Sequence, residues 1–130
     1  MCAIEIGCCG SLNQAELFKK SGFQYLEANI SQIVSMEEKE FQEALSQIRE
    51  LHFPVKAANC FLPGDWPVAH GERDLEKDHA YLEKAAKRLF ALGCGVAVLG
   101  SGGARGLSAE YGLEKGKEQF LSFYRQALEV

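Results

Sequence analysis

Long apolar runs, paired cysteine motifs and an excess of basic residues are all missing from this sequence of 130 residues. No apolar stretch approaches the roughly 18 residues of a membrane-spanning helix, so we expect no membrane partner. The formal net charge of -4 disfavours nucleic acid as a partner, because nucleic-acid binding depends on basic side chains. The first residues show no basic segment followed by an apolar one, so we do not expect a signal peptide.

The cysteines form neither a disulfide framework nor a zinc motif. There are five of them, an odd number, and no two have C-x-x-C spacing. Without an export signal, reduced thiols in the cytoplasm are the natural expectation. We therefore predict a cytoplasmic protein whose cysteines are mostly small buried hydrophobes and hold no metal. These cysteines are Cys2, Cys8, Cys9, Cys60 and Cys94.

Short apolar segments alternate with amphipathic ones along the whole chain. Hydrophobic residues make up 47% of the sequence, enough for a packed core. The apolar segments predict strands over residues 2–7, 25–29, 55–59 and 95–100, with helices beginning near residues 13, 35, 74 and 108 or 110. Repeated strand–helix units imply a parallel sheet with right-handed crossovers. We predict an α/β fold, a single domain over residues 1–130.

A glycine-rich turn follows the fourth predicted strand. It carries Gly100, Gly102, Gly103 and Arg105, and a helix is expected after it. Glycines allow backbone N–H groups to approach a ligand, and an arginine suits phosphate or carboxylate. The turn is thus a candidate anion site before a helix N-terminus. Alternatively, it is only a tight connection in which Arg105 pairs with a carboxylate such as Glu110.

Three further polar residues lie at or after the predicted strand ends, where α/β proteins place their sites. Glu27 ends the second predicted strand; it is a candidate catalytic or hydroxyl-binding carboxylate, or the partner of a nearby Lys or Arg. Asn59 ends the third and either orients a ligand or caps the following turn. His70 lies in the long connection after that strand and is either a general acid or base or a surface histidine.

Three segments together resemble the N-terminal half of a xylose isomerase-like (β/α)₈ barrel of the sugar phosphate isomerase/epimerase family. They are Gly22-Phe23-Gln24-Tyr25-Leu26-Glu27, Ala58-Asn59-Cys60-Phe61-Leu62-Pro63-Gly64 and Leu99-Gly100-Ser101-Gly102-Gly103-Ala104-Arg105. The resemblance covers nearly the whole chain. It implies four parallel βα units, half of a TIM barrel, with strand order 1-2-3-4.

The same resemblance implies a function. A complete member would bind a sugar or sugar phosphate, use a divalent metal to polarise its carbonyl, and move a proton between adjacent carbons as an aldose–ketose isomerase or epimerase. A barrel needs about 250 residues, and the family's metal ligands come from its last four strands. The resemblance therefore implies the substrate-binding half, with Glu27 and His70 as catalytic residues and no metal ligand in this chain.

The alternatives concern what such a half-barrel does by itself. It is either part of a longer protein or a half that covers its open edges by self-association or with a complementary half-barrel. A non-catalytic half-barrel that binds a sugar or anionic ligand, or acts as an assembly module, is the second hypothesis. A third is a doubly wound domain that binds a nucleotide phosphate at Gly100–Arg105; it requires strand one to lie between two other strands.

Overall fold

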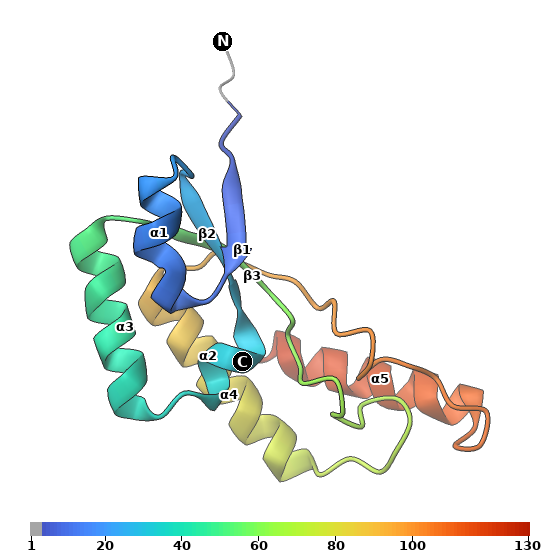
Figure 1. Ribbon diagram of the computed structural model, residues 1–130. Helices are drawn as coiled ribbons and strands as arrows, with labels where there is room; N and C mark the ends of the chain where they lie inside the picture. The colour runs from blue at the N-terminus through green and yellow to red at the C-terminus, as the bar shows by residue number, and fades with distance from the viewer. Residues whose placement is uncertain (1–3) are drawn as a thin grey trace.

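A four-stranded parallel sheet forms the centre of the computed structural model, which describes residues 4–130 (Figure 1). The strands are β1 (Gly7–Gly10), β2 (Tyr25–Asn29), β3 (Val55–Asn59) and β4 (Val96–Ala97). Their spatial order is β1-β2-β3-β4, with every neighbouring pair parallel. This confirms the predicted α/β fold and strand order. It contradicts the doubly wound alternative, which places strand one between two others.

Helices follow each strand in turn. They are the 3₁₀ helix η1 (Leu12–Gln14), α1 (Ala15–Lys20), α2 (Ile30–Ser35), α3 (Glu38–Leu51), α4 (Leu75–Leu92) and α5 (Leu113–Leu128). In Figure 1, α1, α3 and α4 lie to one side of the sheet, whereas α5 lies across the molecule from α3. No helix within residues 4–130 has both the length and the apolar character needed to cross a bilayer.

The two faces of the sheet differ in burial. Leu26 and Ala28 of β2 are fully buried on the helix side, while the alternating Tyr25 and Glu27 are only half-buried. A bulge between β2 and β3 pairs Leu26 with Val55 but Glu27 with Ala57. The skipped residue of β3 keeps the buried and half-buried faces of the two strands aligned, and the half-buried face is the one open to a ligand.

Several helix boundaries match their sequence signals. The Asp74 side chain accepts hydrogen bonds from the backbone N–H groups of Glu76 and Lys77, and α4 ends at Gly93 with a φ of 71°. Both signals were visible in the sequence. By contrast, the predicted helix start at Ser35 is wrong. Residues 30–35 form the unexpected α2, capped by Asn29, and α3 begins at Glu38.

The edge strands and the first and last helices also differ from prediction. Of the strand expected over residues 2–7, Cys2 and residue 3 lie outside the described residues; β1 begins only at Gly7, where pairing with Tyr25 starts. β4 is limited to two residues, although the Val98 N–H still donates to the Ala58 carbonyl at 2.7 Å. The first helical turn is capped at Ser11 rather than Asn13, and α5 starts at Leu113.

Candidate functional site

Glu27 and Asn59 meet on the half-buried face of the sheet. The Asn59 amide Nδ2 donates a hydrogen bond of 2.8 Å to Glu27 Oε1. The same amide lies 3.7 Å from the Cys9 Sγ, and Cys9 is the register partner of Glu27. The three side chains therefore come from three adjacent strands. Sequence reasoning placed Glu27 and Asn59 at one end of the sheet, and the alternation of β1 turns Cys9 toward them.

The positions of the two predicted residues need one correction. Asn59 does end β3, but Glu27 is the third residue of β2, which continues to Asn29. Asn29 is the residue at the strand end, and its side chain caps α2. The Asn59 side chain bonds across the sheet to Glu27 and does not cap the following turn, and its role in orienting a ligand stays a prediction. No Lys or Arg within residues 4–130 forms an ion pair with Glu27.

The carboxylate changes the chemistry of its cysteine neighbour. Partial burial raises the pKa of the Cys9 thiol above its ordinary value, and the negative charge of Glu27 and a hydrogen bond to it raise this pKa further. The Asn59 amide acts in the opposite direction, because it favours the thiolate. The Cys9 thiol therefore stays protonated at neutral pH.

His70 lies in the long connection between β3 and α4 and has no hydrogen bond to Glu27 or Asn59. It is half-buried, and its Nδ1 is buried without a hydrogen-bond partner among the described residues. Its neighbours Val68 and Ala69 are both fully buried, so the segment is anchored to the core. The structure thus fixes the backbone around His70, and the proposed catalytic role stays a prediction.

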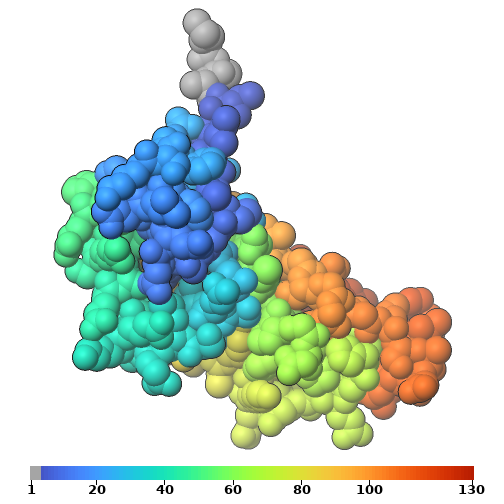
Figure 2. Space-filling view, in the orientation of Figure 1, coloured from blue at the N-terminus to red at the C-terminus, as the bar shows by residue number. Residues whose placement is uncertain are grey.

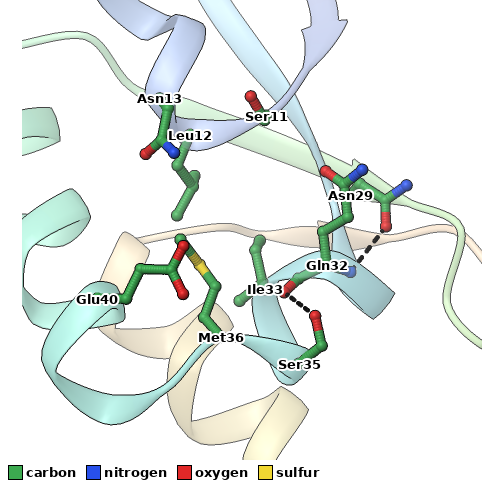
Figure 3. A pocket seen from close by; sticks show the side chains of 9 residues that line it. All are labelled: Ser11, Leu12, Asn13, Asn29, Gln32, Ile33, Ser35, Met36 and Glu40. Carbon is green, nitrogen blue, oxygen red and sulfur yellow. Dashed lines mark hydrogen bonds between the residues drawn. The ribbon is translucent and has the colours of Figure 1, made fainter.

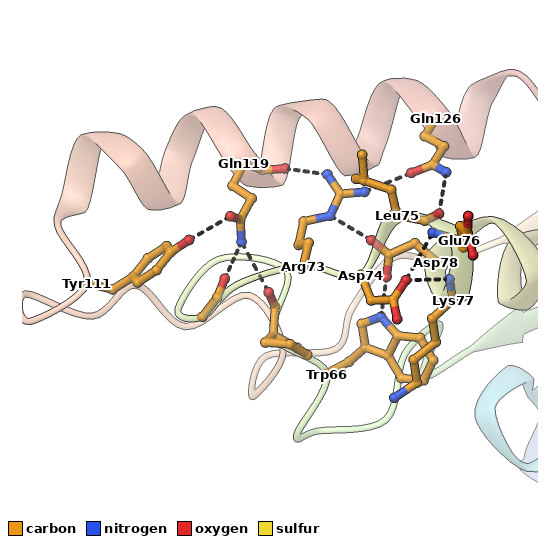
Figure 4. A network of polar contacts seen from close by, with 12 residues as sticks. Trp66, Arg73, Asp74, Leu75, Glu76, Lys77, Asp78, Tyr111, Gln119 and Gln126 are labelled. Atoms are coloured by element: carbon orange, nitrogen blue, oxygen red, sulfur yellow. Dashed lines mark hydrogen bonds and ion pairs between the residues drawn. The ribbon is translucent and has the colours of Figure 1, made fainter.

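A buried polar network holds the connection that carries His70 (Figure 4). Asp78 of α4 binds Arg73 Nε at 2.6 Å through one carboxylate oxygen and accepts a 2.7 Å hydrogen bond from Trp66 Nε1 through the other. Arg73 in turn donates to the Gln119 carbonyl and to Gln126 Oε1 on α5. Gln119 closes the network by donating to the backbone carbonyls of Pro67 and Gly71. The network joins α4, α5 and the connection.

The glycine-rich turn packs against the same connection. The 60–74 and 98–112 segments lie side by side (Figure 2), and Ser101 Oγ accepts a 2.7 Å hydrogen bond from the Leu62 N–H. A methyl group on Gly103 would lie 2.7 Å from the Gly64 carbonyl oxygen. Gly103 is therefore required for loop packing. Gly100 and Gly102 have open space around them.

The expected helix N-terminus beside this turn is wrong, because α5 begins at Leu113. Arg105 does not pair with Glu110; its Nε donates to the Gly100 carbonyl at 2.5 Å, within the turn. Its side chain is exposed. Ligand binding by Gly100, Gly102, Gly103 and Arg105 stays a prediction.

A cavity of about 370 Å³ that the sequence did not reveal lies between the first two βα units (Figure 3). It is lined by Ser11, Leu12, Asn13, Asn29, Gln32, Ile33, Ser35, Met36 and Glu40. Asn29 Oδ1 accepts from the Gln32 N–H and from Ser31 Oγ, so it caps α2. The sequence signal that could have revealed this cavity is the presence of polar residues directly after two of the strands. The best-placed hydrogen-bond acceptor of this cavity, Asn29 Oδ1, is already occupied by the cap. We therefore favour the Glu27–Asn59 pair as the site.

The described residues do not fit the divalent metal that the family resemblance implies. Within residues 4–130, no three His, Cys, Asp or Glu side chains cluster closely enough to hold a metal ion. Glu27 and Cys9 are neighbours, but they lack a third such partner. We therefore derive no chemical step through a metal held by this part of the chain.

Comparison with solved structures shows a likeness in fold. No family model matches the sequence, and no curated protein matches it. The fold is similar to the crystal structure of the 3-keto-D-glucoside 4-epimerase YcjR from E. coli, in its apo form, with a TM-score of 0.68 and 17% sequence identity. The match covers 95% of this chain and 50% of that chain, so this chain spans about half the length of that protein. The likeness supports the predicted fold.

Proposed function

We propose that this chain is the substrate-binding half of a sugar isomerase or epimerase. The Glu27–Asn59 pair carries the proposal, because it places a carboxylate and an amide on the half-buried face near the carboxyl ends of β2 and β3. The fold likeness to a sugar epimerase supports the same class of substrate. The proposal includes a location in the cytoplasm, which the unpaired cysteines suggest.

The two side chains suit the hydroxyl groups of a sugar. The Glu27 carboxylate accepts hydrogen bonds, and Asn59 offers both a donor and an acceptor; its Oδ1 has no hydrogen bond to any described residue. The bond from Asn59 holds Glu27 Oε1 in place, which orients the carboxylate before a ligand arrives. Exposed Arg105 and the open space at Gly100 and Gly102 suit a phosphate on the sugar.

The proposed chemistry is a proton transfer between adjacent carbons. Glu27 would take the proton from the carbon next to the substrate carbonyl, leaving an enediolate. In isomerisation this proton would return to the former carbonyl carbon, while the hydroxyl proton would pass to the former carbonyl oxygen, so that the carbonyl moves by one carbon. His70 is the second proposed acid–base group. Any metal that polarises the carbonyl would need ligands from outside residues 4–130. We therefore expect this half alone to bind the sugar but to convert it slowly.

Titration calorimetry tests the proposal with D-glucose and glucose 6-phosphate as probes. Glu27→Gln and Asn59→Ala should each weaken binding about tenfold, because the first removes the charge from a hydrogen-bond acceptor of the sugar and the second removes the amide that holds Glu27 in place. Glu5→Gln is the matched control: Glu5 forms an ion pair with Lys56 before β1 begins, away from the carboxyl ends of the strands. Undetectable binding of both sugars, or equal losses in all three variants, would contradict the proposal.

A non-catalytic sugar-binding half-barrel is the second candidate. The lack of a three-residue metal-ligand cluster within residues 4–130 favours it. The two functions differ in one observable. A working isomerase incorporates solvent deuterium into the bound sugar, which NMR detects, whereas a binding module leaves the carbon-bound protons unexchanged.

A further inference from the structure

The cavity between the first two βα units is a second place for a small ligand, and the proposed sugar site does not use it (Figure 3). Its volume of about 370 Å³ is at the lower end of the range for small-molecule sites, roughly 300–1,000 Å³. Its walls are the segment after β1, the end of β2, α2 and the start of α3. All of these elements are described and β1 pairs directly with β2, so the cavity does not depend on what covers the outer edges of the sheet.

The cavity has an apolar floor. Leu12 and Ile33 are only 3% and 2% exposed and belong to the core, and the half-buried Met36 packs against the same core. In Figure 3 these three side chains lie between the polar residues on either side. Core packing holds the floor in place without a ligand, so the cavity is preformed and can cover one apolar face of a small molecule.

The polar rim of the cavity offers free hydrogen-bonding groups. The side chains of Asn13, Gln32 and Glu40 form no hydrogen bond or ion pair with another residue within 4–130. The Asn29 cap uses only Oδ1, and Asn29 Nδ2 likewise has no acceptor among the described residues. In the view of Figure 3, Asn13 and Glu40 lie on one side of the floor. Asn29 and Gln32 lie on the other, so a ligand with several hydroxyl groups can take the place of solvent on both sides.

Glu40 determines the charge of the cavity. Glu38 and Glu40 both lie in the first turn of α3, but Glu38 is held by Arg88 at 2.9 Å and by Gln42 at 2.7 Å. Glu40 has no such partner among the described residues, and no Lys, Arg or His is among the residues that line the cavity. The cavity therefore favours a cationic group and disfavours phosphate, in contrast to the turn that carries Arg105.

We propose that this cavity binds a small hydroxylated amine, of the size and kind of an amino sugar. The Glu40 carboxylate accepts hydrogen bonds from the ammonium group of the ligand. The side-chain amides of Asn13, Asn29 and Gln32 bind its hydroxyl groups, since each amide can both donate and accept. The apolar floor lies against the C–H groups of the ligand, which hold no charge and need no hydrogen bond.

NMR titration of the full chain with D-glucosamine and with D-glucose tests the site at slightly acidic pH, where the amine is protonated. The two sugars differ only in an ammonium group that replaces one hydroxyl group. D-Glucosamine should shift the amide signals of residues 11–13 and 32–36, with an affinity about fivefold above that of D-glucose. Neither Glu27 nor Asn59 lines the cavity, so this site is independent of the proposed function. Glu27→Gln should leave D-glucosamine binding in the cavity unchanged, whether or not the proposed function is correct.

Glu40→Gln should weaken D-glucosamine binding about fivefold and remove its advantage over D-glucose, because an exposed ion pair makes a modest contribution. Glu43→Gln is the matched control: Glu43 lies on the same helix, pairs with Lys39 and does not line the cavity. Both glutamates are exposed, so both variants should fold, and NMR signals away from the cavity verify this. The absence of D-glucosamine shifts around the cavity, equal affinity for the two sugars there, or an equal loss in Glu43→Gln would each overturn the proposal.

Discussion

The Asn59 amide donates a 2.8 Å hydrogen bond to Glu27 across the β2–β3 pair. These residues are 32 positions apart in the sequence, and the parallel register together with the bulge at Leu26–Glu27 brings them onto one face. A carboxylate that accepts one hydrogen bond from a neutral amide still has lone pairs for a ligand. This relationship is the basis of the proposed sugar site, and Glu27 also contributes to the raised pKa of Cys9.

Replacing Glu27 with Gln should make Cys9 more reactive. The negative charge of Glu27 raises the Cys9 pKa, so its removal lowers that pKa and increases the thiolate fraction at mildly alkaline pH. Because burial is the larger cause of the raised pKa, we expect only a few-fold faster alkylation. Iodoacetamide labelling of Cys9, followed by mass spectrometry across a pH series, measures the midpoint. Glu5→Gln should leave it unchanged, and an unshifted midpoint in Glu27→Gln would contradict the explanation.

Asp78→Ala should strongly destabilise the fold. The Asp78 and Arg73 side chains are only 3% and 4% exposed, so removing the carboxylate leaves a buried guanidinium without its counter-charge. Breaking a buried pair in this way costs about 3–5 kcal/mol in the free energy of unfolding. Glu83→Ala is the control, since Glu83 forms exposed pairs on the same helix worth less than about 1 kcal/mol. Urea denaturation measures both; similar losses would count against the network.

Arg88→Met should destabilise the protein for a different reason. Arg88 Nη1 donates to the carbonyls of Ile33 at 2.5 Å and Met36 at 2.8 Å, which satisfies the end of α2. Methionine fills similar space but leaves these carbonyls without donors, at a cost of about 2–4 kcal/mol. Arg49→Met removes a single exposed bond of 3.4 Å and should cost far less. The difference between the two urea midpoints is the test.

Gly103→Ala and Gly102→Ala should differ in their effect on stability although the residues are adjacent. A methyl group at Gly103 would lie 2.7 Å from the Gly64 carbonyl oxygen, so the two loops must separate, at about 1–3 kcal/mol. At Gly102 the same methyl group meets nothing within 4 Å and should change stability little. Thermal unfolding of the two variants shows which of the two positions requires glycine for packing and which merely tolerates it.

Local signals predicted the interior of the fold well. Strands 25–29 and 55–59 were placed at their observed bounds, and Asp74 and Gly93 marked both ends of α4. These segments are short apolar runs or a capped amphipathic helix, so nearest-neighbour chemistry decides them. The central strands also have partners on both sides, which holds their ends in register.

The bounds of the two edge strands could not be predicted from local signals. Ile4, Ile6, Val98 and Leu99 have strand character, yet β1 and β4 extend only as far as their single neighbours allow. The sequence likewise did not reveal α2, because the Asn29 cap became evident only from its contact with the Gln32 N–H. Both errors arise where one long-range partner decides between strand, helix and loop.

The sequence by itself determined the class of fold, the order of its units and the candidate residues Glu27 and Asn59, because periodicity and strand ends are local properties. Only the tertiary structure decided what these residues touch. The bulge that places Glu27 and Asn59 on one face, the Cys9 contact and the burial of Asp78 against Arg73 join residues on different elements. Such contacts depend on register and on packing between elements, and no window of neighbouring residues encodes either.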